Sequence, residues 1–426
     1  MIRILKCGET PAEEILSRSF PVSDVAQTAA EIIKNVKERG DAALREYSER
    51  FDGVAIDDFL VSEEEMKEAL DAVSTEFITV LEKAASNIRL FHSYQLREGY
   101  RIENPDGTVL GVKITPIEKV GLYVPGGTAP YPSTVLMDTI PAKIAGCGEI
   151  VMVTPPQKNG KVDPAILAAA HVAGVDRIYK VGGAQAVAAL AYGTESIPKV
   201  YKIVGPGNAY VAAAKKLVYG TVSIDAEAGP SEVLIISDGR SEPSVVAADL
   251  LAQAEHDVMS SAILITDSEE LAKAVQAEIE RQLALLERKK IARASIENNG
   301  KIIIAPSIDE AIDIANEIAP EHLGLCVDEP FRYLDRVRNA GSIFLGRDAP
   351  EPLGDYFAGP NHTLPTGGTA KFGSPLSVDD FIKKSQFTYY TREALNAVSE
   401  DIALFARQEG LTGHAASVLS RKKAEE

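Results

Sequence analysis

The feature that most constrains the fold is an alternation of short β-branched segments with alanine-rich segments, which starts near residue 118. Residues 150–154, 177–181 and 233–237 have the length and residue types of buried strands, and residues 164–171 are typical of a helix. Strands that alternate with helices of this length are joined by crossover connections. The sequence therefore predicts an α/β fold with a largely parallel sheet that is covered by helices on both faces.

The same alternation resumes after residue 244 and predicts a second sheet of similar type. It is built from expected strands at 262–266, 301–305, 324–327 and 342–345 and from expected helices at 244–256, 269–290 and 308–317. Residues 1–100 are predicted to be helical, with capping boxes at 10–13 and 62–65. Residues 349–375 form a Gly/Pro-rich loop too long for a connector, which favours a functional role. Residues 376–426 are predicted to be helical.

Composition excludes several classes of protein. The 426 residues include 44 basic and 62 acidic side chains, and the formal net charge of −18 disfavours binding to nucleic acid or to an anionic membrane. No apolar run is long enough for a membrane helix, and the N-terminus has no apolar signal core. Three widely spaced cysteines exclude a disulfide framework and suit the reducing cytoplasm, where we expect the protein to be located.

Glycine-rich loops are the first candidate ligand sites. They occupy residues 125–127, 182–183, 205–208 and 229–231, each after an expected strand. Such loops let a backbone approach a ligand closely, and the following helix N-termini favour anions, so a dinucleotide or a phosphorylated ligand would fit. Neither the G-x-G-x-x-G fingerprint nor the phosphate-loop lysine pattern is present, and ordinary turns explain each loop equally well.

Histidine is scarce, and four of the six histidines occur beside other candidate ligands. The associations are Gln253 with His256, Glu321 with His322, Asp355 with His362 in the long loop, and Glu409 with His414. If separated segments converge, imidazole with carboxylate suits zinc or manganese, whereas each histidine alone could equally be capped or solvated. The adjacent pair Glu321 and His322 suits acid–base chemistry. These residues indicate an α/β enzyme that depends on a metal.

Eight motifs, in order along nearly the whole chain, resemble the histidinol dehydrogenase family. They are VGLYVPGG at 120–127, GGAQAV at 182–187, VGPGNAYV at 204–211, DAEAGPSE at 225–232, QAEHD at 253–257, APEHL at 319–323, GPNHTLPTGG at 359–368 and EGLTGH at 409–414. No single motif is decisive, but eight in the family's order are highly specific.

The resemblance implies two incomplete Rossmann-like domains, which would explain the missing fingerprint. The expected divisions are an arm at 1–20, a first domain from 21–118 with 232–375, a second domain at 119–231 and a helical segment at 376–426. The implied activity is the zinc-dependent oxidation of L-histidinol to L-histidine through L-histidinaldehyde, at the end of histidine biosynthesis, with two NAD+ as acceptors. The family is a homodimer in which the C-terminal segment reaches into the partner's site.

The resemblance also implies the roles of individual residues. The expected zinc ligands are Gln253, His256, Asp355 and His414, and the expected acid–base pair is Glu321 and His322. Expected substrate contacts are Ser231, His362 and Glu409, together with His322 and the zinc ligands. The expected NAD-binding positions are Tyr123, Gln185 and Asn208.

Three alternatives remain open. A paralogue could use the same fold, zinc and NAD for another small polar alcohol, although His362 and Glu409 fit recognition of an imidazole and so favour histidinol. A metal-dependent hydrolase would need no NAD, which the glycine-rich loops weakly oppose. A non-catalytic metal-binding protein would leave the Glu321–His322 pair without a task.

Overall fold

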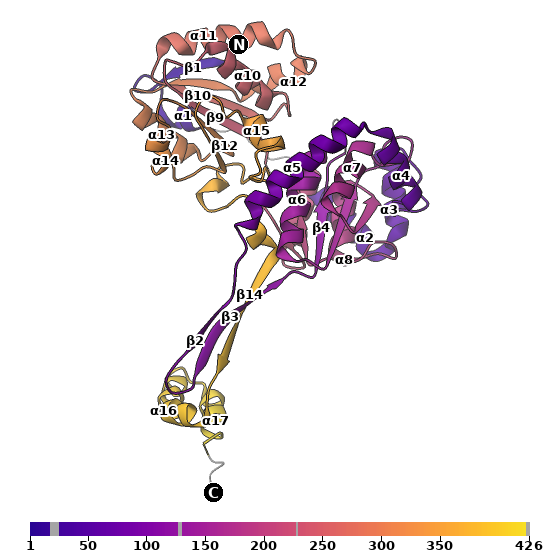
Figure 1. The fold of residues 1–426 in the computed structure, drawn as a ribbon, viewed down its shortest axis with the longest axis vertical. Helices are drawn as coiled ribbons and strands as arrows, with labels where there is room; N and C mark the ends of the chain where they lie inside the picture. The colour runs from indigo at the N-terminus through magenta and orange to yellow at the C-terminus, as the bar shows by residue number, and fades with distance from the viewer. Residues whose placement is uncertain (18–24, 127–129, 227–228, 423–426) are drawn as a thin grey trace. The chain divides into compact units, whose positions relative to one another are not determined.

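The computed structural model describes residues 1–17, 25–126, 130–226 and 229–422 (Figure 1). The chain divides into two compact units. The first comprises Met1–Gln95 and Ile117–Phe381, and the second comprises Leu96–Pro116 and Ile382–Glu426. None of the described helices is both long enough and apolar enough to cross a membrane.

The first sheet of the large unit has five strands in the order β6-β5-β4-β7-β8, all parallel. The strands are β4 (Lys119–Tyr123), β5 (Glu149–Thr154), β6 (Arg177–Lys180), β7 (Lys202–Val204) and β8 (Ser223–Ile224). The connecting helices are α6 (Pro132–Ala145), α7 (Pro164–Ala173), α8 (Gly183–Tyr192) and α9 (Ala209–Val218). Because helices cover both faces, β5 is buried from Ile150 to Thr154, and the expected parallel sheet is confirmed.

The N-terminal helices complete the two cores of this five-stranded sheet. They are α2 (Ala26–Arg39), α3 (Asp41–Tyr47), the π-helix η1 (Ser48–Asp52), α4 (Glu63–Ala72) and α5 (Thr75–Ser93). Val36 shares a core with Val151, and Leu81 shares one with Leu122. These helices were expected to belong with residues 232–375, but their apolar faces are buried against the five-stranded sheet. The outer domain boundaries stay a prediction. The expected cap of α4 is present, since the Ser62 side chain accepts from the Glu65 amide.

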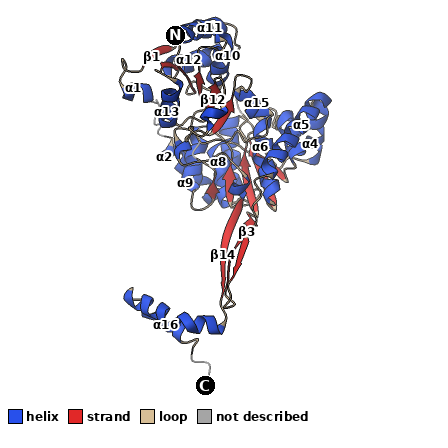
Figure 2. Ribbon diagram, turned by 60° about the vertical axis from the view of Figure 1, so that its left-hand side comes forward, coloured by secondary structure: helices blue, strands red, loops and turns tan. Residues whose placement is uncertain are grey.

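The second sheet has six parallel strands in the order β1-β11-β10-β9-β12-β13. Figure 2 draws strands in red and labels β1 and β12 of this sheet. They are β1 (Arg3–Lys6), β9 (Glu232–Ser237), β10 (Ser261–Thr266), β11 (Lys301–Ile304), β12 (His322–Cys326) and β13 (Ser342–Leu345). Its helices are α1 (Ala12–Leu16), α10 (Pro243–Ala254), α11 (Glu269–Leu283), α12 (Lys289–Asn298), α13 (Ile308–Ile318), α14 (Phe331–Leu334) and α15 (Glu351–Tyr356). Two short 3-10 helices, η2 (Thr369–Lys371) and η3 (Val378–Phe381), follow.

Two sequence-based expectations about this sheet are wrong. The chain was expected to be helical from residue 1, but β1 pairs with β11 and forms an edge of the sheet. One long helix was expected at 269–290, but α11 ends at Leu283 and α12 begins at Lys289. The break allows both helices to turn apolar faces to the same core, to which Ile279 and Ile296 belong.

The small unit contains an antiparallel sheet in the order β14-β3-β2 and two helices. The strands are β2 (Tyr100–Glu103), β3 (Val109–Pro116) and β14 (Ile382–Tyr389), and the helices are α16 (Arg392–Gln408) and α17 (Thr412–Leu419). Residues 376–426 were expected to be helical, which β14 contradicts. The strand was missed because its sequence, IKKSQFTY, lacks an apolar periodicity and its side chains are mostly exposed.

Candidate active site

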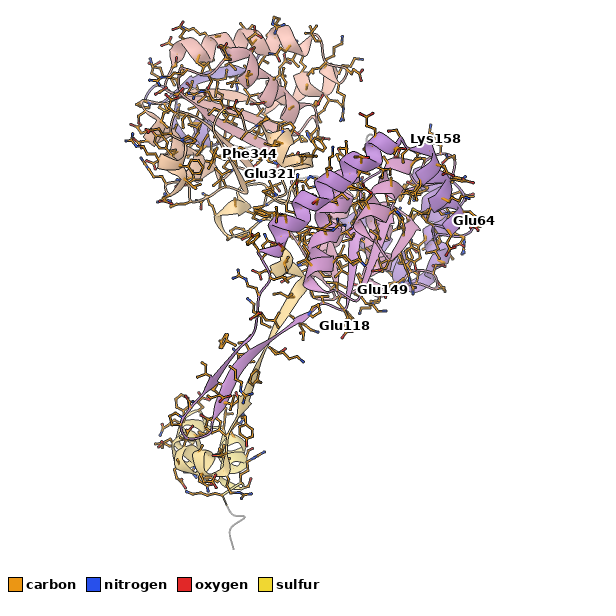
Figure 3. All side chains as sticks on the ribbon, in the orientation of Figure 1. Glu64, Glu118, Glu149, Lys158, Glu321 and Phe344 are labelled. Atoms are coloured by element: carbon orange, nitrogen blue, oxygen red, sulfur yellow. The ribbon has the colours of Figure 1, made fainter. Side chains whose placement is uncertain are left out.

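The acid–base pair of the prediction lies at the amino ends of two neighbouring strands. Glu321 directly precedes β12, and His322 begins it (Figure 3 labels Glu321). One carboxylate oxygen of Glu321 accepts from the backbone amide of Glu232 at 2.7 Å, and His322 Nδ1 lies 3.0 Å from the carbonyl oxygen of Glu232. Both side chains are about 95% buried. The first residue of β9 therefore fixes both groups, and Ser231 lies directly before it. The strand expected at 324–327 begins two residues earlier, at His322.

The contact with Glu232 determines which nitrogen of His322 carries a proton when the ring is neutral. A carbonyl oxygen only accepts hydrogen bonds, so Nδ1 must donate. Nε2 is then the basic nitrogen. It lies 3.4 Å from Asp355 Oδ1 and has no hydrogen-bond partner among the residues that the structure describes. When the ring is neutral, Nε2 is therefore a buried, oriented proton acceptor.

Burial and charge perturb the titration of the pair. Burial lowers the pKa of His322, but the carboxylates of Glu351, Glu321 and Asp355 outweigh it and raise this pKa well above its ordinary value. Burial raises the pKa of Glu321 to about 8, against the opposing charge of His322. Burial also raises the pKa of Glu351 to about 7. A carboxyl group with a pKa near neutrality is suited to accept and release protons.

A possible metal site lies beside this pair. Ligand atoms of His256, Glu351 and Asp355 all lie within 4.8 Å of one another. His256 follows α10, whereas Glu351 and Asp355 lie four residues apart on α15 and thus on one face of it. Asp355 was expected in the long loop, and its place in α15 corrects that. Glu351 was missed, although its spacing from Asp355 is a signal that could have found it.

The buried side chain of Gln253, on α10, is connected to this group through Glu351. In the amide orientation that satisfies both ends, its nitrogen donates to the two carboxylate oxygens of Glu351 at 2.8 and 3.1 Å. Three of the four expected zinc ligands thus belong to one neighbourhood. The fourth, His414, lies in α17 of the small unit and is exposed, as is Glu409 at the end of α16. That these two residues join the site stays a prediction.

His362 lies in the loop after α15, and its ring is held at both nitrogens. Nδ1 lies 3.0 Å from the carbonyl oxygen of Asp355, and Nε2 lies 3.3 Å from the hydroxyl of Thr134 on α6. Its neighbours anchor the same segment, because the Asn361 amide donates to the Met137 carbonyl oxygen at 2.6 Å. Burial lowers the pKa of His362, which favours the neutral ring. The segment thus connects α15 to α6.

The expected cofactor positions lie at the carboxyl edge of the five-stranded sheet. Tyr123 ends β4, and its hydroxyl accepts from the Gly183 amide at 3.0 Å; Gln185 is buried in the first turn of α8. Gly205, after β7, has φ of 113°, and a Cβ there would collide with the carbonyl oxygen of Tyr123. Asn208 caps α9 by accepting from two backbone amides. Residues 127 and 227–228 of the family-like motifs lie outside the described residues.

Comparisons with known protein families, sequences and structures all identify the same family. A family model described as histidinol dehydrogenase matches residues 17–422. Histidinol dehydrogenase from Bacillus cereus is 58% identical over 402 residues, 94% of each chain, and that from Streptococcus mutans is 54% identical over 406 residues, 95% of each chain. The crystal structure of histidinol dehydrogenase from Elizabethkingia anophelis matches with a TM-score of 0.94 at 40% identity, covering 99% of this chain and 98% of that one.

Proposed function

The chain belongs to the histidinol dehydrogenase family, and we propose that it oxidises L-histidinol to L-histidine through L-histidinaldehyde, with two NAD+ and one bound zinc ion per subunit. The observation that carries the chemistry is the fixed ring of His322. Its Nε2 is buried, directed and without a hydrogen-bond partner among the described residues, next to a group of metal-binding side chains. That arrangement fits a base that takes a proton from an alcohol held in place.

The donor set fits a zinc ion. Imidazole, carboxylate and amide oxygen are all zinc ligands in proteins, and a catalytic site keeps a position open for substrate. We assign Gln253, His256 and Asp355 as ligands, with His414 as the fourth. When bound, the ion supplies an attachment point for the nitrogen atoms of the substrate, and NAD+ supplies the acceptor for hydride.

In the first oxidation, His322 Nε2 accepts the hydroxyl proton of histidinol while hydride leaves the carbinol carbon, and the carbonyl double bond of the aldehyde forms. General-base help of this kind typically contributes about 10²–10⁴-fold. The buried position of His322 keeps bulk water away from the reacting atoms.

In the second oxidation, Glu321 takes a proton from water and the resulting hydroxide adds to the aldehyde carbon, while protonated His322 returns its proton to the carbonyl oxygen to give a hydrate. His322 then accepts a hydroxyl proton of the hydrate as the second hydride leaves, and the carboxylic acid forms. The high pKa of Glu321 makes it a stronger base than an ordinary carboxylate once it is ionised. The backbone of Glu232 in β9 contacts both side chains, so Glu321 and His322 keep the same relative position in both oxidations.

The remaining predicted contacts complete the proposal. Ser231, His362 and Glu409 are assigned to the substrate, and the doubly held ring of His362 suits recognition of a flat, polar group. Tyr123, Gln185 and Asn208 are assigned to NAD, at a sheet edge where α8 and α9 begin. Helix N-termini favour the charge of a pyrophosphate. With three free cysteines, we propose a cytoplasmic location.

Features of the small unit support the proposal that the protein is a homodimer. Its described apolar core is limited to residues of α16 and α17, including Ala403, Ala406 and Ala415. Large apolar side chains are exposed on its strands and on α16, namely Tyr100, Ile102, Phe387, Tyr389, Leu404 and Phe405. A gathering of exposed apolar side chains marks an interaction surface. We assign it to a second copy of the chain, whose site would receive His414 and Glu409.

The test is to count NADH. The zinc-loaded protein should form two NADH per L-histidinol, and chelation should abolish the activity until zinc is returned. A panel of other small polar alcohols distinguishes a paralogue, since a paralogue would prefer one of them. Folded, zinc-loaded protein that forms no NADH with histidinol or with any alcohol of the panel would contradict the proposal and favour a hydrolase or a binding protein.

A further inference from the structure

Glu351 is a buried carboxylate that the proposed chemistry leaves without a role. It is 5% exposed, on the face of α15 that also carries Asp355. One of its oxygens belongs to the group of ligand atoms that lie within 4.8 Å of one another, together with atoms of His256 and Asp355. A buried carboxylate needs partners, because an unpaired charge in the interior is costly.

The partner that the structure provides is Gln253, which is fully buried on α10. Its amide nitrogen donates to both oxygens of Glu351, at 2.8 and 3.1 Å, when the amide is turned to satisfy both ends. In the opposite orientation the amide oxygen would face the two oxygens of Glu351, which are acceptors only when this carboxyl group is ionised, as it is beside a bound cation. Glu351 therefore selects one of two amide orientations that are nearly equal in shape.

The selected orientation matters because the two ends of an amide differ as ligands. The oxygen has lone pairs for a cation, whereas the nitrogen carries two hydrogens and no available lone pair. We propose that Glu351 is a positioning residue that binds the Gln253 amide nitrogen and thereby presents the Gln253 carbonyl oxygen to the metal. This inference rests on the proposed zinc site, and groups that orient a ligand in this way commonly affect metal affinity strongly.

The experiment is a double-substitution cycle read out as metal binding. Zinc affinity is measured by competition with a chromogenic chelator, and the visible spectrum of the cobalt-substituted protein reports the ligand geometry. The variants are E351Q, Q253E and the double variant Q253E/E351Q. The matched control is E255Q, which removes a carboxylate beside His256 in the sequence while the Gln253–Glu351 pair stays intact.

We expect E351Q to weaken zinc binding about 10–100-fold, because two facing amides no longer fix the orientation of Gln253. Q253E opposes two carboxylates and should also weaken binding. The double variant should bind more tightly than either single variant, since the new amide at position 351 donates to the new carboxylate at position 253. E255Q should bind zinc as the unsubstituted protein does.

Three results would overturn the inference. One is unchanged affinity in E351Q, and another is additive loss in the double variant, which would make Glu351 an independent ligand. If E351Q does not fold, the zinc affinities of Q253E and of the double variant are compared instead. Zinc binding by the double variant that is equal to or weaker than that of Q253E is the third result that overturns the inference. Unsubstituted protein that binds no zinc would instead refute the proposed zinc site itself.

Discussion

Asp138, on α6, offers a quantitative test of how the large unit holds a buried acid. It is fully buried, its Oδ1 accepts from the Thr363 hydroxyl at 2.9 Å, and its Oδ2 has no hydrogen-bond partner within the described part of the chain. Burial and the nearby carboxylate of Asp225 raise its pKa to about 8, against the opposing effects of Thr363 and Lys215. Asp138 is therefore neutral in the folded protein at pH 7 and ionised in the unfolded chain.

This difference makes stability depend on pH with a definite sign. Between the ordinary value of 3.8 and about 8, the folded state holds a proton that the unfolded state has lost, so stability falls as pH rises. Applying the linkage relation with those two values gives a loss of about 4 kcal/mol between pH 5 and pH 9. Asp138→Asn removes the titrating group but keeps an oxygen that accepts from Thr363. The stability of this variant should therefore not show the loss with rising pH.

The assay is urea unfolding of chelator-treated protein at pH 5 and pH 9. The quantity compared is the free energy of unfolding of Asp138→Asn minus that of the unsubstituted protein. We expect this difference to be about 2–4 kcal/mol more favourable to the variant at pH 9 than at pH 5. Asp71→Asn, an exposed change on α4, serves as the control and should show no such difference. A stability difference between Asp138→Asn and the unsubstituted protein that is the same at both pH values would refute the reasoning.

Three further predictions concern the site. Glu321→Gln should slow the oxidation of supplied histidinaldehyde about 10²–10⁴-fold and leave the first oxidation nearly unchanged. Both rates are measured from NADH absorbance after rapid mixing, and an equal loss in both oxidations would count against the water-activating role of Glu321. Gly205→Ala should raise the KM for NAD+ in steady-state assays and leave the KM for histidinol almost unchanged, because the added Cβ collides with the Tyr123 carbonyl oxygen. An unchanged KM for NAD+ would contradict the proposal that NAD+ binds at this edge of the sheet. Mixed His322→Ala and His414→Ala subunits should recover activity, and no recovery after verified subunit exchange would argue for sites within one chain.

The two parallel sheets were predictable because their strands are buried on both faces. Residues 150–154 and 233–237 are continuous apolar or β-branched segments, and both lie in cores. The edge strand β1 has only four residues, and its sequence, RILK, is too short for a periodicity to be recognised. Two strands of the small unit, β2 and β14, are mostly exposed, so no buried face selected their residues. A strand can therefore be recognised in this sequence mainly where its side chains are buried.

The candidate site was predictable where its residues are close in sequence. Gln253 with His256, and Glu321 with His322, stand out as local pairs. Glu351 was missed although it lies four residues from Asp355, because this segment was expected to be a loop and not a helix. Its contact with Gln253, almost a hundred residues away, exists only after α10 and α15 pack. Nor does the sequence reveal that the acid–base pair lies at the amino ends of β9 and β12, since this depends on which strands become neighbours.

The segment around His362 connects the candidate active site at one sheet to the proposed cofactor edge of the other. His362 is held to the Asp355 carbonyl oxygen on one side and to Thr134 of α6 on the other, and Thr363 donates to Asp138 one helical turn further along α6. α6 follows β4, whose end carries Tyr123 at the expected NAD edge. If the proposed substrate lies beside Asp355 and the proposed nicotinamide at that edge, these hydrogen bonds help to fix the two binding positions relative to each other. Asp138 ionises in the folded protein only as pH rises through about 8, and its charge would then lie beside the Thr363 hydroxyl. Any loss of alignment should therefore begin near the upper end of the pH range over which stability falls.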